Sequence, residues 1–189
     1  MLSSNVNYIV SGLERSGTSV MMQMLYRGGV PVAFDESRPA DEHNPKGYYE
    51  LAGGKIINQL IDGIFDMKAH TGRVVKVTAY GLKFLPEGQY RIIYMQRNLD
   101  EVIRSMHKMG GDQIDQEKDK LLFGKLDSVS LKLLSDREDI SFVTIRYHDV
   151  IENPRREIEK VSNFWEVSFD LNQAIEAVDS KLYRNRGVK

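Results

Sequence analysis

The chain has 189 residues, of which 41% are apolar and 28% charged, and its formal net charge at pH 7 is −1. It has no cysteine, which excludes disulfides, thiolate metal sites and cysteine nucleophiles. Such a small net charge gives no overall attraction to nucleic acid or to membranes, and no apolar run approaches the roughly 20 residues that span a bilayer. We therefore expect one cytoplasmic domain over residues 1–189, with no nucleic-acid partner and no membrane span.

The first half of the chain begins with a short apolar strand, expected at residues 7–11. A helix at 17–28 follows, with apolar side chains at helical spacing. A polar loop that contains proline covers 29–48. A second helix is expected at 50–66, because isoleucine and leucine recur there every three or four residues. The second strand is expected at 73–77.

The third strand, at 91–96, is followed by a helix whose apolar residues share one face: Leu99, Val102, Ile103 and Met106. Asn98 is a suitable N-cap for this helix. The charged segment 112–136 is expected to be helical and partly solvated. The fourth strand is expected at 140–146.

Two helices are expected to close the chain. Asn153 and Pro154 form the N-cap and first residue of one helix, with Trp165 on its buried side. The other covers about 170–179. Strands that alternate with helices indicate a parallel sheet covered on both faces. We therefore predict an α/β fold, a three-layer α/β/α arrangement with a central parallel sheet, similar to the P-loop NTPases.

A glycine-containing turn lies between the first strand and the first helix. It spans residues 12–19, and its central residues are Arg15, Ser16, Gly17, Thr18 and Ser19. A strand, a glycine turn and a helix in this order bind anions, because the turn exposes backbone N–H groups and the helix N-terminus adds its positive dipole end. A ligand with a phosphate-like group is therefore the first to consider.

The turn differs from the loop of nucleotide kinases. That loop has a lysine directly after its second glycine, whereas this chain has Thr18, and its one cation is Arg15. A Mg-nucleotide site also needs a carboxylate after a neighbouring strand. The third strand ends instead in a cation, Arg97, and Asp149 is a weaker candidate for the metal. The loop favours an anionic donor handled without a metal, and a small-metabolite kinase that uses ATP and Mg²⁺ is the alternative.

A second anion site is expected at the third strand. Arg97 directly follows that strand, where ligands bind in open α/β sheets. Ser105 lies two turns into the next helix. An arginine can donate two parallel hydrogen bonds to a phosphate. Together with the first loop, these residues fit a donor that has two separated anionic groups.

Five stretches, in order, resemble motifs of the sulfotransferases. Residues 12–19 resemble their 5′-phosphosulfate loop, and residues 91–105 resemble their 3′-phosphate motif. Residues 75–78 lie where cytosolic members carry a K-T-H stretch. Residues 41–50 are similar to an N-P-K-G-[FY]-x-E segment of bacterial members, and residues 146–154 to a Y-E-D-L-x-x-x-P segment. The resemblance implies a single sulfotransferase-like domain.

The resemblance also implies a donor and a reaction. The donor is 3′-phosphoadenosine-5′-phosphosulfate (PAPS), whose sulfuryl group is transferred to a hydroxyl or an amine, leaving adenosine 3′,5′-bisphosphate (PAP). Backbone amides of residues 16–19 would hold the 5′-phosphate, and Arg15 would stabilise the charge that develops as the S–O bond breaks. Arg97 and Ser105 would bind the 3′-phosphate. No metal is required.

The chain departs from the family motifs at three positions, of which Leu99, in place of a proline, is expected to do little harm because Asn98 can still cap the helix. Cytosolic members usually have lysine where this chain has Arg15, and arginine there is similar to the bacterial and tyrosylprotein-type members. The histidine that serves as the general base of cytosolic members is replaced by Thr78, which cannot accept a proton at neutral pH. Lys76 does match a family lysine and is a candidate for assisting the transfer. The missing histidine leaves open a non-catalytic relative that only binds the nucleotide.

The general base must therefore come from elsewhere. Glu42 and His43, in the polar loop, are candidates, although a solvent-exposed loop histidine is an equally good interpretation of His43. Glu50 is a third candidate, but its expected role is to interact with the dipole at the start of the 50–66 helix. No motif identifies the acceptor, which we expect to be a small molecule, a glycan or a peptide.

The C-terminal tail gives a weaker indication of residues that bind the donor. Arg184 and Arg186 resemble a segment that closes over the 3′-phosphate in cytosolic members, and a frayed basic terminus is the alternative. The chain is short for the family. The acceptor cleft is therefore expected to be open, or to be completed by the second subunit of a homodimer.

Overall fold

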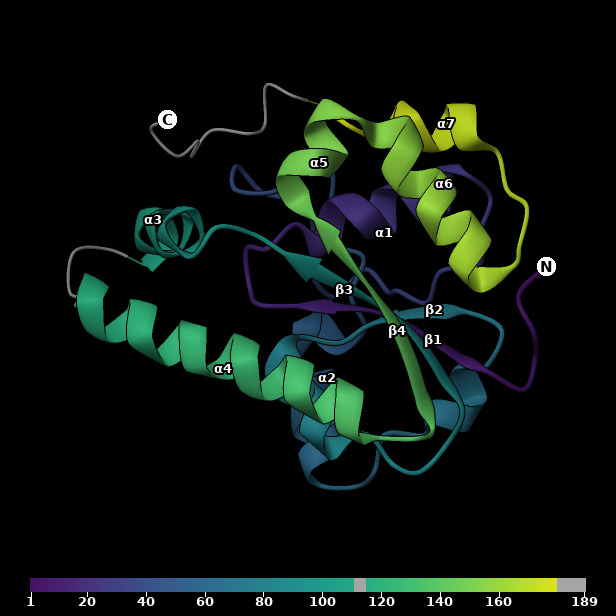
Figure 1. The fold of residues 1–189 in the computed structure, drawn as a ribbon, viewed down its shortest axis with the longest axis horizontal. Coiled ribbons are helices and arrows are strands. Elements are labelled where there is room, and N and C mark those ends of the chain that lie inside the picture. Colours follow the sequence, from purple (N-terminus) through teal and green to yellow (C-terminus); the bar gives the residue numbers. More distant parts are fainter. Residues whose placement is uncertain (111–114, 180–189) are drawn as a thin grey trace.

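The computed structural model describes residues 1–110 and 115–179 (Figure 1). Four strands form one sheet in which every pairing is parallel. The strands are β1 (Asn7–Gly12), β2 (Val74–Lys76), β3 (Tyr90–Gln96) and β4 (Ile140–Arg146), and their order is β2-β1-β3-β4. The expected central parallel sheet is confirmed.

The strand order places a ligand crevice beside β1. Val10 in this strand pairs with Lys76 of β2 on one side and with Ile93 of β3 on the other. The chain therefore leaves β1 toward one edge of the sheet and later returns to form its other half. In open α/β sheets, ligands bind outside the carboxyl ends of the strands at such a switch point. The loops that follow β1 and β3 meet there.

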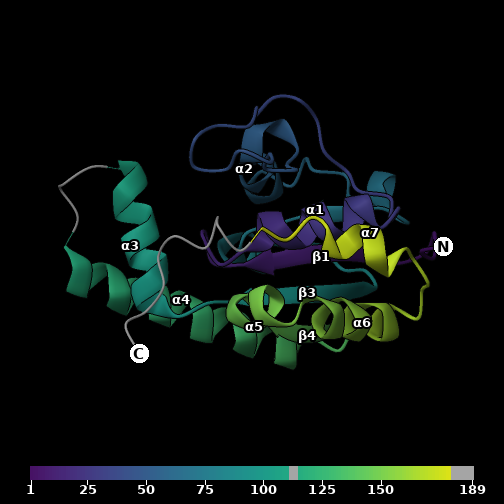
Figure 2. The ribbon, with the colours of Figure 1, turned by 90° about the horizontal axis from the view of Figure 1, so that it is seen from above.

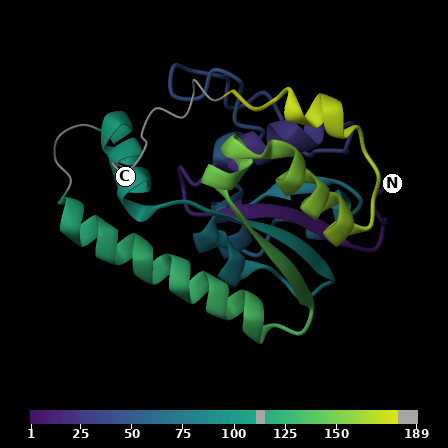
Figure 3. The ribbon, with the colours of Figure 1, turned by 45° about the horizontal axis from the view of Figure 1, so that its top comes forward.

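Helices cover both faces of the sheet, which confirms the three-layer arrangement (Figure 3). One face packs against α1 (Thr18–Arg27), α5 (Tyr147–Glu152), α6 (Pro154–Trp165) and α7 (Leu171–Ile175). The other packs against α2 (Ile56–Ile61), α4 (Gln116–Asp136) and the 3₁₀-helix Ala79–Phe84. The helix α3 (Leu99–Gly110) lies at one end of the sheet, where it contacts α4 (Figure 2).

Two expected helix starts have the predicted caps. The side chain of Asn98 accepts a hydrogen bond from the amide of Asp100 at 2.9 Å, and that of Asn153 accepts one from the amide of Arg156 at 3.4 Å. Trp165 is buried, and its ring centroid lies 5.2 Å from that of Tyr8 in an edge-on contact. The cap at Asn98 fixes where α3 begins, and therefore where the chain leaves β3 beside the crevice.

The expected helix at 50–66 was wrong in extent. The segment contains a 3₁₀-turn at Ala52–Gly54 and the short α2, which ends at Ile61. Three glycines in the segment have positive φ angles, which interrupt a regular helix. The side chain of Ile64 is 71% exposed, so the apolar spacing there did not mark a buried face.

Other elements were missed or shortened. The helix α5 and the 3₁₀-helices Met67–His70 and Ala79–Phe84 were not predicted, and α7 is shorter than the expected 170–179. A single turn buries too few side chains to give a clear periodic pattern. None of the helices within the described residues combines the length and apolarity needed to cross a membrane.

Candidate active site

The loop between β1 and α1 depends on its two glycines. Gly12 has φ 144°, and a Cβ atom there would lie 2.4 Å from the carbonyl oxygen of Met95. Gly17 has φ 100°, and a Cβ atom there would lie 2.3 Å from the ring of Tyr147. Both the backbone angle and the space therefore require glycine. The close packing fixes the loop against β3 and α5.

The start of α1 is open to an anion. Gly17 occupies the N-cap position, and no side chain caps the helix. The first amides of a helix have no partner within it, so those of Thr18 and Ser19 are available to a ligand. The amide of Ser16 already donates to the carbonyl of Leu13 at 3.2 Å. The Ser16 hydroxyl is buried and has no hydrogen-bond partner among the described residues.

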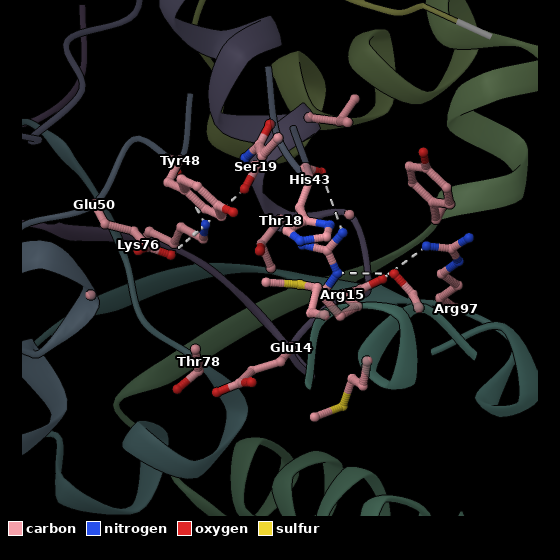
Figure 4. Close-up of a pocket in the computed structure, with 18 of the residues that line it drawn as sticks. Glu14, Arg15, Thr18, Ser19, His43, Tyr48, Glu50, Lys76, Thr78 and Arg97 are labelled. Atoms are coloured by element: carbon pink, nitrogen blue, oxygen red, sulfur yellow. Dashed lines mark hydrogen bonds and ion pairs between the residues drawn. The ribbon is translucent and has the colours of Figure 1, made fainter. Parts of the chain in front are cut away.

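Arg15 connects three distant parts of the chain (Figure 4). It has a left-handed backbone conformation, with φ 64°. Its Nε atom donates to the Ser105 hydroxyl at 3.0 Å, and one terminal nitrogen donates to the carbonyl of His43 at 3.4 Å. Its own carbonyl accepts from Arg97 at 3.1 Å. The two predicted anion motifs therefore meet directly at Arg15.

The side chain of Arg97 is held on two sides. Its Nε atom pairs with the carboxylate of Glu101 at 2.9 Å, and both side chains are less than one-tenth exposed. The guanidinium lies 4.6 Å from the ring centroid of Tyr147, a distance typical of a cation–π contact. Burial lowers the pKa of Arg15, and the nearby Arg97 cation adds to this effect. Two guanidinium groups held this close indicate a site for an anion.

These residues surround a cavity of about 500 Å³. The charged residues of its lining are mostly cationic, with five basic side chains: Arg15, Arg38, Lys76, Arg97 and Lys108. The lining contains two carboxylates, Glu14 and Glu50. The cavity therefore has a local positive charge that the net charge of −1 for the whole chain does not reveal.

Lys76, at the end of β2, is buried and fully hydrogen-bonded. Its ammonium nitrogen lies 2.8 Å from a carboxylate oxygen of Glu50, 2.9 Å from the Ser19 hydroxyl and 3.0 Å from the carbonyl of Tyr48. An ammonium group has three N–H donors, so all three have partners. Lys76 therefore connects the segment near residue 50 to the start of α1.

Glu50 lies inside the cavity lining, and its expected role at a helix start was wrong. Its second carboxylate oxygen lies 2.8 Å from Arg38, whose guanidinium is 3.5 Å from the ring centroid of Tyr48. Burial alone would raise the pKa of Glu50, but Lys76 and Arg38 outweigh burial and hold it below its usual range. Glu50 is therefore an ionised carboxylate between two cations.

The structure brings most of the predicted site residues together. Those that line the cavity are Arg15, Gly17, Thr18, Ser19, His43, Lys76, Arg97 and Ser105. Ser16 is buried within the loop. Glu42 is 87% exposed and is not among the residues that line the cavity. Arg184 and Arg186 lie outside the described residues.

Several residues of the cavity lining were not predicted from the sequence, and three of them bear on its chemistry. Arg38 belongs to no motif, and only its placement over Tyr48 reveals its role. Tyr147 was assigned to a family motif without a function, although an aromatic residue after a strand could have indicated the site. Glu14 lies within the glycine loop itself, and a carboxylate inside an anion-binding loop was the signal that could have identified it.

Comparisons with known proteins identify a family. The sulfotransferase domain model matches residues 6–186. The sulfotransferase domain from the olefin synthase of Synechococcus PCC 7002 is similar in structure, with a TM-score of 0.58 and 15% identity over 100% of this chain and 82% of that chain. The sulfotransferase domain from the curacin biosynthetic pathway has a TM-score of 0.55 and 16% identity over 91% and 77% of the two chains.

Retinol dehydratase, solved in complex with androsterone and the inactive cofactor PAP, has a TM-score of 0.50 and 13% identity over 97% of this chain and 65% of that chain. No protein of curated function matches the sequence. Because the sequence identities are low, the similar structures show only that the fold is shared. The family assignment rests on the domain model, which matches residues 6–186.

Proposed function

Because the chain belongs to the sulfotransferase family, we propose that it transfers a sulfuryl group from PAPS to a hydroxyl or amine of a small-molecule, glycan or peptide acceptor. The observation that carries this proposal is the meeting of the two anion motifs in one cavity. Arg97 donates to the carbonyl of Arg15 at 3.1 Å, and Arg15 donates to Ser105 at 3.0 Å. A donor with a phosphate at each end of one nucleoside suits two such motifs.

The residues present fit the 5′ end of the donor. The uncapped start of α1 offers the amides of Gly17, Thr18 and Ser19 to a phosphate. The buried hydroxyl of Ser16, which has no partner among the described residues, supplies one more donor. Retinol dehydratase, which has the same fold, holds PAP in its crystal structure. No metal is needed, because the charge of the cavity comes from side chains.

Arg97 and Ser105 are proposed to bind the 3′-phosphate. Arg97 is oriented by Glu101 and by the ring of Tyr147, so little side-chain entropy is lost when a phosphate binds. The Ser105 hydroxyl contacts Arg15 in this structure. We expect that contact to change when a phosphate oxygen takes its place. The 3′-phosphate is the group that distinguishes this donor from ATP.

Arg15 and Lys76 have different proposed roles in the transfer. Arg15 stabilises the negative charge that develops on the leaving oxygen as the S–O bond breaks. Lys76 assists indirectly: it holds Ser19 at the start of α1, and its charge adds to the field of the cavity. His43 lines the cavity, and Glu42 directly precedes it in the same loop, so both stay candidates for the general base by their position in the chain.

Thermal stability in the presence of ligands tests the donor assignment. A ligand that binds only the folded state raises Tm. We expect a larger rise with PAP than with ATP plus Mg²⁺ at the same concentration. The opposite order would contradict the proposal and favour a kinase. A transfer assay with sulfur-labelled PAPS over a panel of phenols, sugars, amines and peptides then separates an enzyme from a relative that only binds the nucleotide.

A further inference from the structure

The two carboxylates in the cavity have different surroundings. Glu50 is held between Lys76 and Arg38, each at 2.8 Å, and these cations keep its pKa below the usual range. A carboxylate in this state is a poor proton acceptor, because accepting a proton would break two ion pairs. Glu50 is therefore suited to holding the wall of the cavity together and not to removing a proton from an acceptor.

Glu14 has no such partner. It is exposed and lines the cavity, and no hydrogen bond or ion pair within the described residues engages its carboxylate. Figure 4 shows its side chain extending toward Thr78, two residues after the end of β2. The side chain of Arg15 instead donates a hydrogen bond to Ser105. The side chains of the neighbours Glu14 and Arg15 therefore point in different directions, and the backbone of Arg15 between them is left-handed. The carboxylate is free to accept a proton inside the cavity.

His43 also lines the cavity but is placed less favourably. Its carbonyl accepts a hydrogen bond from Arg15, and its ring nitrogen Nε2 lies 3.6 Å from the exposed carboxylate of Glu42. It therefore lies on the side of Arg15, where the leaving oxygen is proposed to be. In a transfer where the attacking and leaving oxygens are in line, the base must be on the other side of the transferred group.

We propose that Glu14 is the general base of the transfer, an inference that rests on the proposed function. As the acceptor oxygen forms its bond to sulfur, its proton passes to the carboxylate of Glu14. The bond between sulfur and the oxygen of the 5′-phosphate breaks, and its electron pair stays on that oxygen beside Arg15. Thr78 faces Glu14 and has no group that could accept the proton.

The test compares two acceptors that differ in their need for a base. Phenol is protonated at about pH 8, whereas 4-nitrophenol is largely ionised and needs no base. We measure transfer from sulfur-labelled PAPS to each. With Glu14→Gln we expect transfer to phenol to fall by about 10²–10⁴-fold, and transfer to 4-nitrophenol to fall by less than about fivefold. Glu138→Gln, an exposed glutamate before β4, is the matched control and leaves both rates unchanged.

A second variant tests the position of the base. Thr78→His in the Glu14→Gln background places an imidazole where the carboxylate of Glu14 extends. We expect it to restore part of the transfer to phenol. The acid limb of the pH–rate profile of this double variant is expected to lie in the histidine range, about 6.5. Restored activity with an acid limb outside the histidine range would contradict the role given to Glu14.

Equal loss with both acceptors, or no loss with phenol, overturns the inference. The affinity of Glu14→Gln for PAP, measured by calorimetry, separates this failure from a failure of the donor assignment. PAP bound as tightly as by the unsubstituted protein, together with equal loss for both phenols, rejects Glu14 alone as the base. If the unsubstituted protein does not prefer PAP to ATP plus Mg²⁺, the proposed function itself is wrong, and this inference is rejected with it.

Discussion

The two walls of the cavity are built in different ways. The wall from residues 12–19 is fixed by backbone geometry, with two glycines packed against β3 and α5 and an uncapped helix start. The opposite wall, from residues 38–50, is irregular and is held by side chains: Arg38 on Tyr48, and Glu50 on Lys76. The fold of the first wall should therefore tolerate changes outside its glycines, even where such changes abolish activity. The second should fail when a single charge is removed.

Among the variants that compare the two walls, the largest effect is expected at Arg15, on the backbone-built wall. Arg15→Ala removes the cation beside the leaving oxygen, and loss of one such group typically lowers kcat by about 10²–10³-fold. We expect this loss in transfer from sulfur-labelled PAPS, with a much smaller change in PAP affinity. Arg15→Lys is the control, and it should retain most of the activity because it keeps the charge. Equal losses for the two variants would show that the charge at this position does not drive the transfer.

The next largest effect, a loss of thermal stability, is expected in the wall formed by residues 38–50. Glu50→Gln leaves Lys76 buried without its counter-ion, and breaking a buried pair from one side costs roughly 3 kcal/mol. For a chain of this size, that corresponds to a Tm lower by about 6–12 °C. Calorimetry measures the difference. Glu36→Gln, an exposed glutamate of the same loop, is the control and should change Tm by less than about 2 °C.

The contribution of Glu50 to the stability of the folded state should also depend on pH. Since its pKa is lowered in the folded state, its contribution to stability is fully present above the unfolded glutamate pKa, about 4.3, and is lost as the pH falls through the folded-state value. The Tm difference between the parent and Glu50→Gln should therefore be greatest above about pH 5 and narrow below about pH 4. A difference independent of pH would indicate that packing, and not charge, makes the contribution.

A glycine of the loop and a glycine that follows α1 allow a sharper comparison. Gly17 and Gly29 both have positive φ angles, at 100° and 83°, but a Cβ atom at Gly29 would meet nothing within 4 Å. Gly29→Ala should therefore cost about 1 kcal/mol from backbone strain alone. Gly17→Ala adds the clash with Tyr147 and should cost about 2–3 kcal/mol. Urea denaturation measures both, and equal costs would show that Tyr147 moves aside freely.

The same contrast explains what the sequence could predict. The four strands, the caps at Asn98 and Asn153, and the meeting of the glycine loop with Arg97 follow from local signals: apolar runs, capping residues and short motifs at strand ends. The carboxyl ends of adjacent parallel strands share one edge of the sheet. Two motifs, each at the carboxyl end of one of two adjacent strands, therefore predict a common site without any knowledge of side-chain contacts.

The side-chain-built wall could not be predicted in this way. The pair between Glu50 and Lys76 joins residues 26 positions apart, and neither residue type indicates the other. The expected helix at 50–66 failed because apolar spacing was given more weight than the glycines at 53, 54 and 63. The partner of a buried charge depends on how irregular segments fold over the sheet, and propensity carries no information about that.

The affinity for PAP and ADP, measured by calorimetry with the parent protein and with Arg97→Ala, tests the central claim most directly. Each ligand has two phosphates, but only PAP carries one at the 3′ position, which Arg97 is proposed to bind, whereas both phosphates of ADP are at the 5′ end. We expect the parent to prefer PAP, and Arg97→Ala to lose about 10–100-fold in affinity for PAP with little change for ADP. An Arg97→Ala protein that keeps its fold and the full preference for PAP would contradict the account.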